Sequence, residues 1–189
     1  VKLSQALNSR KVIIPRAALS ELLRFLSGSE KPVFLQIKET DNQVVFGVGD
    51  VILTARILAG EFPKFEKIIP KSSKVKVILD KEDLVRAVKT ASVFARESAN
   101  IVKFKVKKDY LLVSAESSKS GSQKTKIEAK IEGEELEIAY NFRFLEDFLK
   151  TVGANEVEIE LTDTHSPGVF RDPKDPNFLH LIMPVRVQD

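Results

Sequence analysis

The sequence repeats one pattern of predicted secondary structure three times, and this repeat constrains the fold more than any other feature. Each copy has a short apolar run, then a residue suited to a helix start, then a leucine four residues later. The helix-start residues are Pro15, Asp80 and Asn141, spaced 65 and 61 residues apart. Asp and Asn favour this position because their side chains accept hydrogen bonds from free N–H groups of the first helical turn.

Apolar residues recur every three or four places after each start, which predicts three amphipathic helices. Their expected core positions are Leu19, Leu22, Leu23 and Leu26; Leu84, Val88, Ala91 and Ala95; and Leu145, Phe148, Leu149 and Val152. Three strand-like runs follow each helix, separated by turn residues. These runs are 33–38, 44–48 and 51–58; 101–106, 110–115 and 125–131; and 156–161, 168–171 and 179–187.

The repeating unit is therefore one strand, one helix and three strands, which predicts an α+β fold with antiparallel sheets. Its period is too long for solenoids of about 33 residues per repeat. A doubly wound parallel sheet would instead alternate helices with single strands. Two units make ~120 residues, an ordinary domain size. We therefore expect a partial domain with a connector over 1–73 and a complete domain over 74–189, in the C-terminal part of a longer protein.

Composition excludes several classes of protein. The chain has 189 residues, of which 43% are hydrophobic and 30% charged, so a globular fold is expected. It has no cysteine, which rules out disulfide scaffolds, thiol catalysis and cysteine-bound zinc. No apolar run approaches the ~18 residues that cross a membrane, and no export signal is recognisable. We therefore predict no membrane partner and a cytoplasmic location.

The candidate catalytic residues form no recognisable constellation. His165 and His180 are the two histidines, and neither has a serine or aspartate at a catalytic spacing. Asp172 and Asp175 flank a lysine between prolines, which suits a turn better than a metal site. No glycine-rich phosphate loop occurs. The sequence predicts no enzyme activity, no cofactor and no metal.

Basic side chains lie on all three predicted helices, although the net charge is only +3. They are Arg16 and Arg24; Lys81, Arg86, Lys89 and Arg96; and Arg143 and Lys150. Such residues either form an ordinary solvated face or track the phosphates of a nucleic acid without reading its bases. The pattern of charges leaves both interpretations open.

Two apolar features also allow two interpretations. Val93 and Phe94 fall outside the core face of their helix, so they either pack on a neighbouring strand or mark an interface. The segment 179–187 is strongly apolar and carries Met183, the one methionine of the chain. It either closes the sheet or lines a groove for a peptide.

Four motifs, in order along the chain, resemble those of the bacterial sliding clamp, the beta subunit of DNA polymerase III. They are Val12-Ile13-Ile14-Pro15-Arg16; Gly60-Glu61-Phe62-Pro63-Lys64-Phe65 with Ile68-Ile69-Pro70; Tyr140-Asn141-Phe142-Arg143-Phe144-Leu145 with Asp147; and Ile182-Met183-Pro184-Val185-Arg186. The resemblance implies a DNA clamp fold with antiparallel sheets outside and helices lining the DNA channel. It also implies a non-catalytic processivity factor for DNA replication, working as a homodimeric ring.

The resemblance further implies partners and sites. The partners would be double-stranded DNA, bound without sequence preference, and the polymerase III alpha subunit, the clamp loader and repair polymerases, bound through linear peptides. The DNA-binding residues would be Arg16, Arg24, Lys81, Lys89, Arg96 and Arg143. The hydrophobic peptide cleft would include Pro63, Lys67, Ile68, Pro167, Leu181, Ile182, Met183, Pro184, Val185 and Arg186, and the dimer interface Val93 and Phe94. One wall of the cleft would lie upstream of Val1, and Lys67 stands where the family often has arginine. The alternatives are a protein-interaction module that never meets DNA and a small-molecule enzyme on a duplicated α+β scaffold.

Overall fold

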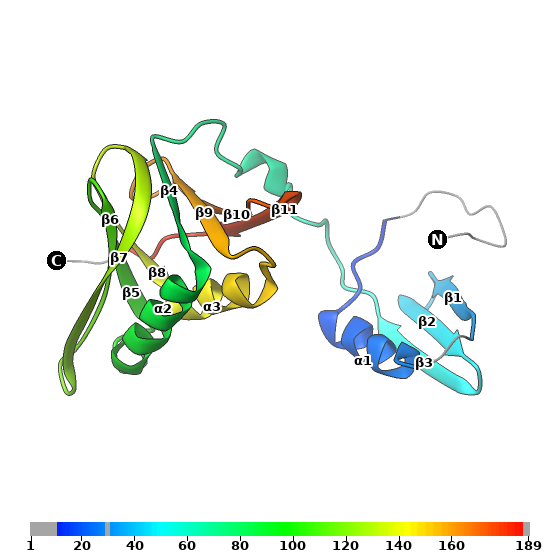
Figure 1. Cartoon of the computed structure of the whole chain (residues 1–189). Helices are drawn as coiled ribbons and strands as arrows, with labels where there is room; N and C mark the ends of the chain where they lie inside the picture. Colours follow the sequence, from blue (N-terminus) through cyan, green and yellow to red (C-terminus); the bar gives the residue numbers. More distant parts are fainter. Residues whose placement is uncertain (1–10, 29–30, 187–189) are drawn as a thin grey trace. The chain divides into compact units, whose positions relative to one another are not determined.

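The computed structural model describes residues 11–28 and 31–186, and the chain divides into two compact units, Val1–Pro63 and Lys64–Asp189. The N-terminal unit holds one helix and three strands (Figure 1). These elements are α1 (Arg16–Leu26), β1 (Val33–Lys38), β2 (Gln43–Val48) and β3 (Val51–Arg56). The strands form one antiparallel sheet in the order β1-β2-β3.

The C-terminal unit contains two copies of the repeat in one eight-stranded antiparallel sheet. The sheet order is β11-β10-β9-β4-β7-β6-β5-β8. A short helix η1 (Phe65–Lys67) precedes the first copy, which is β4 (Val75–Asp80), α2 (Lys81–Ala95), β5 (Ile101–Val106), β6 (Tyr110–Ser117) and β7 (Gly121–Gly133). The second copy is β8 (Leu136–Asn141), α3 (Phe142–Thr151), β9 (Glu156–Leu161), β10 (Gly168–Asp172) and β11 (Asp175–Ile182). The pairs β4·β9 and β5·β8 join the two copies, which confirms the predicted fold class.

The predicted helix starts at Asp80 and Asn141 are confirmed. The Asp80 carboxylate accepts a hydrogen bond from the Asp83 N–H at 2.9 Å, and the Asn141 side chain accepts one from the Arg143 N–H at 3.0 Å. Each bond satisfies a donor that the first helical turn leaves free. These caps fix where each helix leaves its preceding strand.

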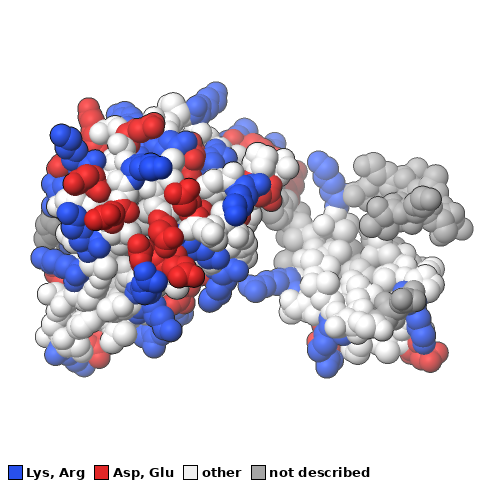
Figure 2. Space-filling view, in the orientation of Figure 1, with Lys and Arg blue, Asp and Glu red and all other residues white. Residues whose placement is uncertain are grey.

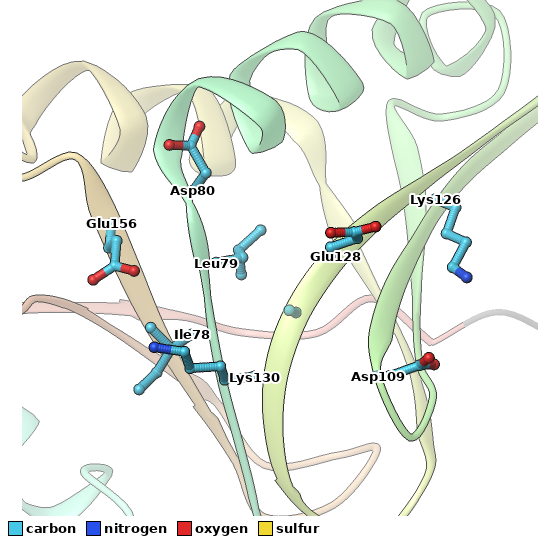
Figure 3. A pocket seen from close by; sticks show the side chains of 9 residues that line it. Ile78, Leu79, Asp80, Asp109, Lys126, Glu128, Lys130 and Glu156 are labelled. Atoms are coloured by element: carbon cyan, nitrogen blue, oxygen red, sulfur yellow. The ribbon is translucent and has the colours of Figure 1, made fainter.

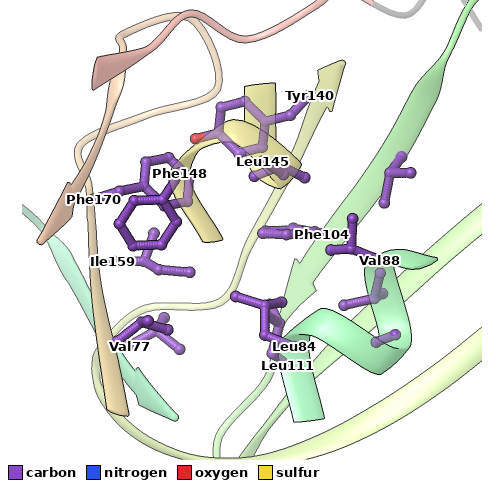
Figure 4. Close-up of a cluster of buried hydrophobic side chains, with 14 of the residues drawn as sticks. Val77, Leu84, Val88, Phe104, Leu111, Tyr140, Leu145, Phe148, Ile159 and Phe170 are labelled. Carbon is purple, nitrogen blue, oxygen red and sulfur yellow. The ribbon is translucent and has the colours of Figure 1, made fainter. Parts of the chain in front are cut away.

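One hydrophobic core fills the space between the sheet of the C-terminal unit and its two helices (Figure 4). Tyr140 is fully buried in this core, with its ring edge-on to Phe104 at 5.7 Å and to Phe170 at 5.6 Å between ring centroids. The predicted core residues of α2 and α3 are all buried, from Leu84 on one helix to Val152 directly after the other. Because both repeats contribute rings and aliphatic chains to this core, neither can bury its apolar face without the other.

The core prediction is wrong for two of the four leucines of α1, and the other two, Leu22 and Leu26, are half-buried. Leu19 and Leu23 were expected inside, but they are 41% and 67% exposed, and Ala18 is the buried residue of α1. The apolar run before α1 also forms a single bridge, between Ile13 and Leu58, instead of the expected strand. A lone repeat has no second helix or sheet to cover its helix, so its apolar side chains remain exposed within the described part of the chain.

Several boundaries differ from those expected, and two of them affect the candidate site. Residues 64–73 group with the C-terminal unit, whereas the expected division fell after residue 73. The Thr162 hydroxyl donates to the Ser72 carbonyl at 2.9 Å, which ties this segment to the loop after β9. The last strand ends at Ile182, not at residue 187, because Pro184 has no N–H for the ladder. Residue 187 lies outside the described residues.

Candidate peptide-docking and DNA-facing surfaces

The last residue of β11 is buried, and the apolar residue directly after the strand is exposed to solvent. Register pairs Gly168 with Ile182, so the chain places Pro167 across from Met183. Met183 is 57% exposed, whereas Ile182 is 1% exposed and belongs to the core. Side chains alternate along a strand, so Met183 can contact a ligand and Ile182 supports the strand from below.

The residues after β11 extend this apolar surface. Leu181, Pro184 and Val185 are half-buried, and Arg186 is exposed. The Val185 N–H donates to the Ala139 carbonyl at 2.8 Å, which fixes the segment against β8. We call the exposed and half-buried members the terminal surface: Pro167, Leu181, Met183, Pro184, Val185 and Arg186. It contains every predicted cleft residue of 167–186 except Ile182, which the fold turns inward.

The sequence analysis missed Phe144, a further exposed aromatic residue of this unit. Phe144 is 53% exposed and lies one turn before Phe148 on α3. The Phe148 ring is 5.7 Å from the His180 ring, so this side of α3 runs beside β11. The sequence could have indicated its exposure, because Phe144 falls outside the helical spacing of the core residues Leu145, Phe148 and Leu149. Burial lowers the pKa of His180, so the imidazole beside this surface is neutral at neutral pH.

The other predicted cleft residues lie in the connector. Lys67 ends η1 and is exposed, and Ile68, directly after it, is 52% exposed. Pro63 is also exposed and is the last residue of the N-terminal unit. The predicted cleft residues therefore come from three separate stretches of sequence.

Basic residues of α2 and α3 gather where these two helices pack together. Arg96 and Arg143 line a hollow of about 530 Å³, together with Phe142, Glu146, Asp147 and Lys150. Neither arginine has an ion pair among the described residues, whereas Lys150 lies 3.8 Å from both Glu146 and Asp147. Lys89 is exposed two turns before Arg96 on the same side of α2. Lys89, Arg96 and Arg143 therefore offer positive charge on this side of the C-terminal unit that no described ion pair compensates.

The other predicted DNA-binding residues are placed differently. The Lys81 ammonium donates to the Val152 carbonyl at 2.7 Å and so links the start of α2 to the end of α3. Arg24 forms an ion pair with Glu21 and lies over the Phe25 ring at 4.9 Å. Arg16 is exposed at the first position of α1. Lys and Arg side chains alternate with Asp and Glu over the visible face of the C-terminal unit (Figure 2).

The structure separates the two predicted interface residues. Val93 is 61% exposed, whereas Phe94 is half-buried and packs against the core. The predicted apolar contact on α2 is therefore presented mainly by Val93, with Phe94 supporting it.

A second hollow, of about 480 Å³, lies beside β4 and β7 (Figure 3). Two of its charged residues already serve the fold, since Asp80 caps α2 and the Lys126 ammonium lies 4.2 Å from the Tyr110 ring centroid. Within residues 11–28 and 31–186, no group of three His, Cys, Asp or Glu side chains is placed to hold a metal.

Family models match nearly the whole chain. The model of the C-terminal domain of the DNA polymerase III beta subunit matches residues 66–186, and that of its central domain matches residues 1–64. The chain belongs to the DNA polymerase III beta subunit family. The two models meet next to the division between the compact units.

Individual members of this family agree with the match. The chain is 31% identical over 188 residues to the beta sliding clamp of Staphylococcus aureus, covering 98% of this chain and 49% of the relative. The beta subunit of Thermotoga maritima superposes with a TM-score of 0.81 at 26% identity, over 94% of this chain and 48% of that one. The sliding clamp of Bartonella birtlesii bound to griselimycin superposes with a TM-score of 0.82 at 30% identity, over 93% of this chain and 47% of that one. The chain spans about half the length of the relatives it matches. No helix in its described part is long and apolar enough to cross a membrane.

Proposed function

We propose that this chain is the C-terminal portion of a sliding clamp subunit, a non-catalytic processivity factor for bacterial DNA replication in the cytoplasm. The observation that carries the proposal is the terminal surface, where Met183 is exposed directly after β11 and the preceding residue, Ile182, is buried in the core. Membership of the clamp family supports this assignment. An exposed methionine with flanking apolar residues suits the docking of short apolar peptides, because its thioether adapts to different side chains.

The terminal surface would receive linear peptides of the replicative polymerase, the clamp loader and repair polymerases. Lys67, Ile68 and Pro63 would contribute from the connector, and Phe144 from α3. The Bartonella birtlesii relative was solved with griselimycin, which makes that compound a suitable probe for this chain.

The peptide site is tested by griselimycin binding to the 189-residue chain. Met183→Ala is expected to weaken binding about tenfold, as removal of a central contact residue does. Val93→Ala is the matched control, because Val93 is equally exposed but lies on α2. Equal affinities for the wild type and Met183→Ala would overturn the assignment of this surface.

Double-stranded DNA would lie along α2 and α3, held by phosphate contacts without base recognition. Lys89, Arg96 and Arg143 carry this part of the proposal because they lack ion pairs among the described residues. Few such contacts suit a ring that slides, since each phosphate contact adds affinity and salt dependence.

The DNA surface is tested with a labelled duplex at low salt. Reversing the charge of Lys89, Arg96 and Arg143 is expected to abolish binding by the chain. Arg86→Glu is the control, because Arg86 already pairs with Asp83 and Glu82 on the same helix. Unchanged binding by the triple variant would contradict the DNA role and favour a protein-interaction module.

The N-terminal unit would be half of the middle clamp domain. Its exposed apolar residues on α1, β1 and β3 would pair with another strand–helix–three-strand unit, as the two repeats of the C-terminal unit do. Val93 and Phe94 would contribute to the contact between subunits of the homodimeric ring.

A further inference from the structure

A hollow of about 280 Å³ lies between the connector, residues 64–73, and the strands β9 and β10. Residues 70–73 form one side of it, and the other side is formed by Glu160, Thr162, Val169 and Arg171. The Thr162 hydroxyl donates to the Ser72 carbonyl at 2.9 Å, and the Lys74 N–H donates to the Leu161 carbonyl at 2.9 Å. These bonds join the two sides within the C-terminal unit. We call this site the connector hollow.

The register of three strands places the connector hollow next to the terminal surface. Leu181 of the terminal surface pairs with Val169 on β10, and Val169 pairs with Glu160 on β9. Residues paired in this way lie on the same face of a sheet, so the three side chains form a row. Neighbouring strands are about 4.8 Å apart, and an extended chain advances about 3.3 Å per residue. A peptide docked at Leu181 would therefore reach the hollow within about three residues.

This row lies on the face of the sheet opposite the hydrophobic core. The residues next to it, Phe170 and Ile182, belong to the core cluster. Val169 does not belong to that cluster, yet it is only 2% exposed. Val169 and the half-buried Pro70 line the same hollow, so the connector covers this face of the sheet. The connector hollow thus has a buried apolar residue at its base and polar side chains around it.

The charged side chains that line the connector hollow carry an excess of positive charge. Lys71 and Arg171 contribute cations, and Glu160 contributes the one carboxylate. The Arg171 Nε donates to the Glu160 carboxylate at 3.0 Å, which compensates one of the two cations. Lys71 is exposed and has no ion pair among the described residues. The Lys71 ammonium therefore offers uncompensated charge to a ligand in the hollow.

Arg171 also retains hydrogen-bonding capacity. A guanidinium group has five N–H donors, and within the described part of the chain only the one on Nε has a hydrogen-bond partner. Its terminal nitrogens remain available, and their fork geometry matches the two oxygens of a carboxylate. The connector hollow thus presents two cationic donors, Lys71 and Arg171, beside the place where an apolar peptide would dock.

We infer that the connector hollow binds an acidic side chain that flanks the apolar residues of a docked peptide. The inference rests on the proposed peptide docking at the terminal surface and adds a determinant of its specificity. The carboxylate would accept hydrogen bonds from the Lys71 ammonium and the terminal nitrogens of Arg171. A basic flanking residue would instead meet the uncompensated Lys71 and be disfavoured. Peptides with a glutamate or aspartate about three residues from their apolar residues would therefore be selected.

The test measures two peptides with the 189-residue chain by isothermal titration calorimetry. The acidic probe is Glu-Gly-Ser-Leu-Phe-Leu-Ser-Gly-Glu, and the neutral probe has glutamine in place of each glutamate. Both probes have blocked ends, and a glutamate at each end serves either orientation of the peptide. The wild type is expected to bind the acidic probe about threefold more tightly, because partly exposed charge pairs contribute modestly. At about 1 M salt, where the Debye length is ~3 Å, this preference is expected to disappear.

Lys71→Glu is expected to remove the preference without changing the affinity for the neutral probe. The variant turns the excess of positive charge in the hollow into an excess of negative charge, so the acidic probe becomes the weaker ligand. Lys74→Glu is the matched control, because Lys74 is exposed next to the connector but does not line the hollow. This control is expected to keep the preference of the wild type.

Met183→Ala separates apolar docking from the recognition of charge. It is expected to weaken both probes by the same factor and to leave their ratio unchanged. Equal binding of the two probes by the wild type, a preference that survives Lys71→Glu, or one that Lys74→Glu removes as well would overturn the inference. If neither probe binds while griselimycin does, the inference fails and the proposed function survives. Loss of griselimycin binding in the wild type would instead defeat the proposed function.

Discussion

Leu19 and Leu84 occupy equivalent positions in two copies of the repeat, four residues after the helix-start residue, yet Leu84 is fully buried and Leu19 is 41% exposed. The difference arises because α2 packs beside α3 in a complete pair of repeats, while α1 has no second repeat within the described residues. The same residue type in the same pattern thus has two different energetic roles.

Leu84→Ala is expected to lower the free energy of unfolding by about 3 kcal/mol, because it removes a fully packed side chain and leaves a cavity. Leu19→Ala is expected to cost about 1 kcal/mol or less, since much of its surface is already in water. Urea unfolding of the 189-residue chain measures both. Equal losses would mean that α1 is covered in solution.

Tyr140→Phe is expected to stabilise the C-terminal unit by about 1 kcal/mol. The Tyr140 hydroxyl is buried without a hydrogen-bond partner among the described residues, and this burial raises the pKa of Tyr140 well above its ordinary value. Thermal unfolding measures the change. A lower melting temperature for the variant would show that the hydroxyl has a partner in solution.

Gly168→Ala is expected to destabilise the same unit, because a Cβ at this position would collide with the Tyr140 hydroxyl and approach the Phe170 ring to 3.0 Å. In the Tyr140→Phe background the cost is expected to be smaller, since the closest of the three contacts, with the hydroxyl oxygen, is removed. A double-mutant cycle measures this coupling. Additive effects would contradict the predicted contact.

Asp172→Asn is expected to destabilise the chain at neutral pH and to do so less as the pH falls. The Asp172 carboxylate accepts hydrogen bonds from the backbone N–H groups of Lys174 at 2.8 Å, Gly153 at 2.7 Å and Ala154 at 3.2 Å. These bonds, that of Lys174 first, hold its pKa below the ordinary value of 3.8.

The direction of this pH dependence follows from the lowered pKa of Asp172. The folded state binds this proton less readily than the unfolded state, so the stabilisation is present above the unfolded pKa near 3.8 and is lost as the pH falls through the lower folded value. Unfolding measured between neutral and strongly acidic pH tests this. A difference between wild type and variant that stays constant with pH would contradict it.

Lys81→Met is expected to lower the stability of the fold, whereas Lys89→Met is expected to weaken DNA binding. Lys81→Met removes the donor to the Val152 carbonyl and is expected to cost about 1 kcal/mol of stability. Lys89→Met is expected to change stability by less than about 0.5 kcal/mol and to weaken binding of a DNA duplex at low salt. The opposite pattern would assign Lys81 to the DNA surface.

Much of the local structure could be predicted from sequence. The helix starts at Asp80 and Asn141 were predictable because a cap depends on residues within one helical turn. The strands 33–38, 101–106 and 156–161 were predictable because alternation and turn residues are also local signals. The end of β11 was predicted five residues too late, since apolar character continued past Ile182 while Pro184 ended the hydrogen-bond ladder.

The candidate site was harder to predict than the helices and strands. Apolar composition identified the segment around Met183, but only the folded unit shows that Met183 is exposed and Ile182 is buried. Lys81 and Lys89 carry the same charge on the same helix. Only the position of α3 gives the Lys81 ammonium a carbonyl to bind, and so distinguishes its role from that of Lys89.

The sequence by itself determined the repeat, its helix caps, its antiparallel strands and the resemblance to the sliding clamp family, because each depends on short-range patterns of residues. The tertiary structure decided which apolar faces are covered and which charges are compensated. Burial and pairing depend on elements brought together from distant parts of the chain. The leucines of α1 and α2 therefore look alike in sequence, and only the packing of a second repeat gives them different environments.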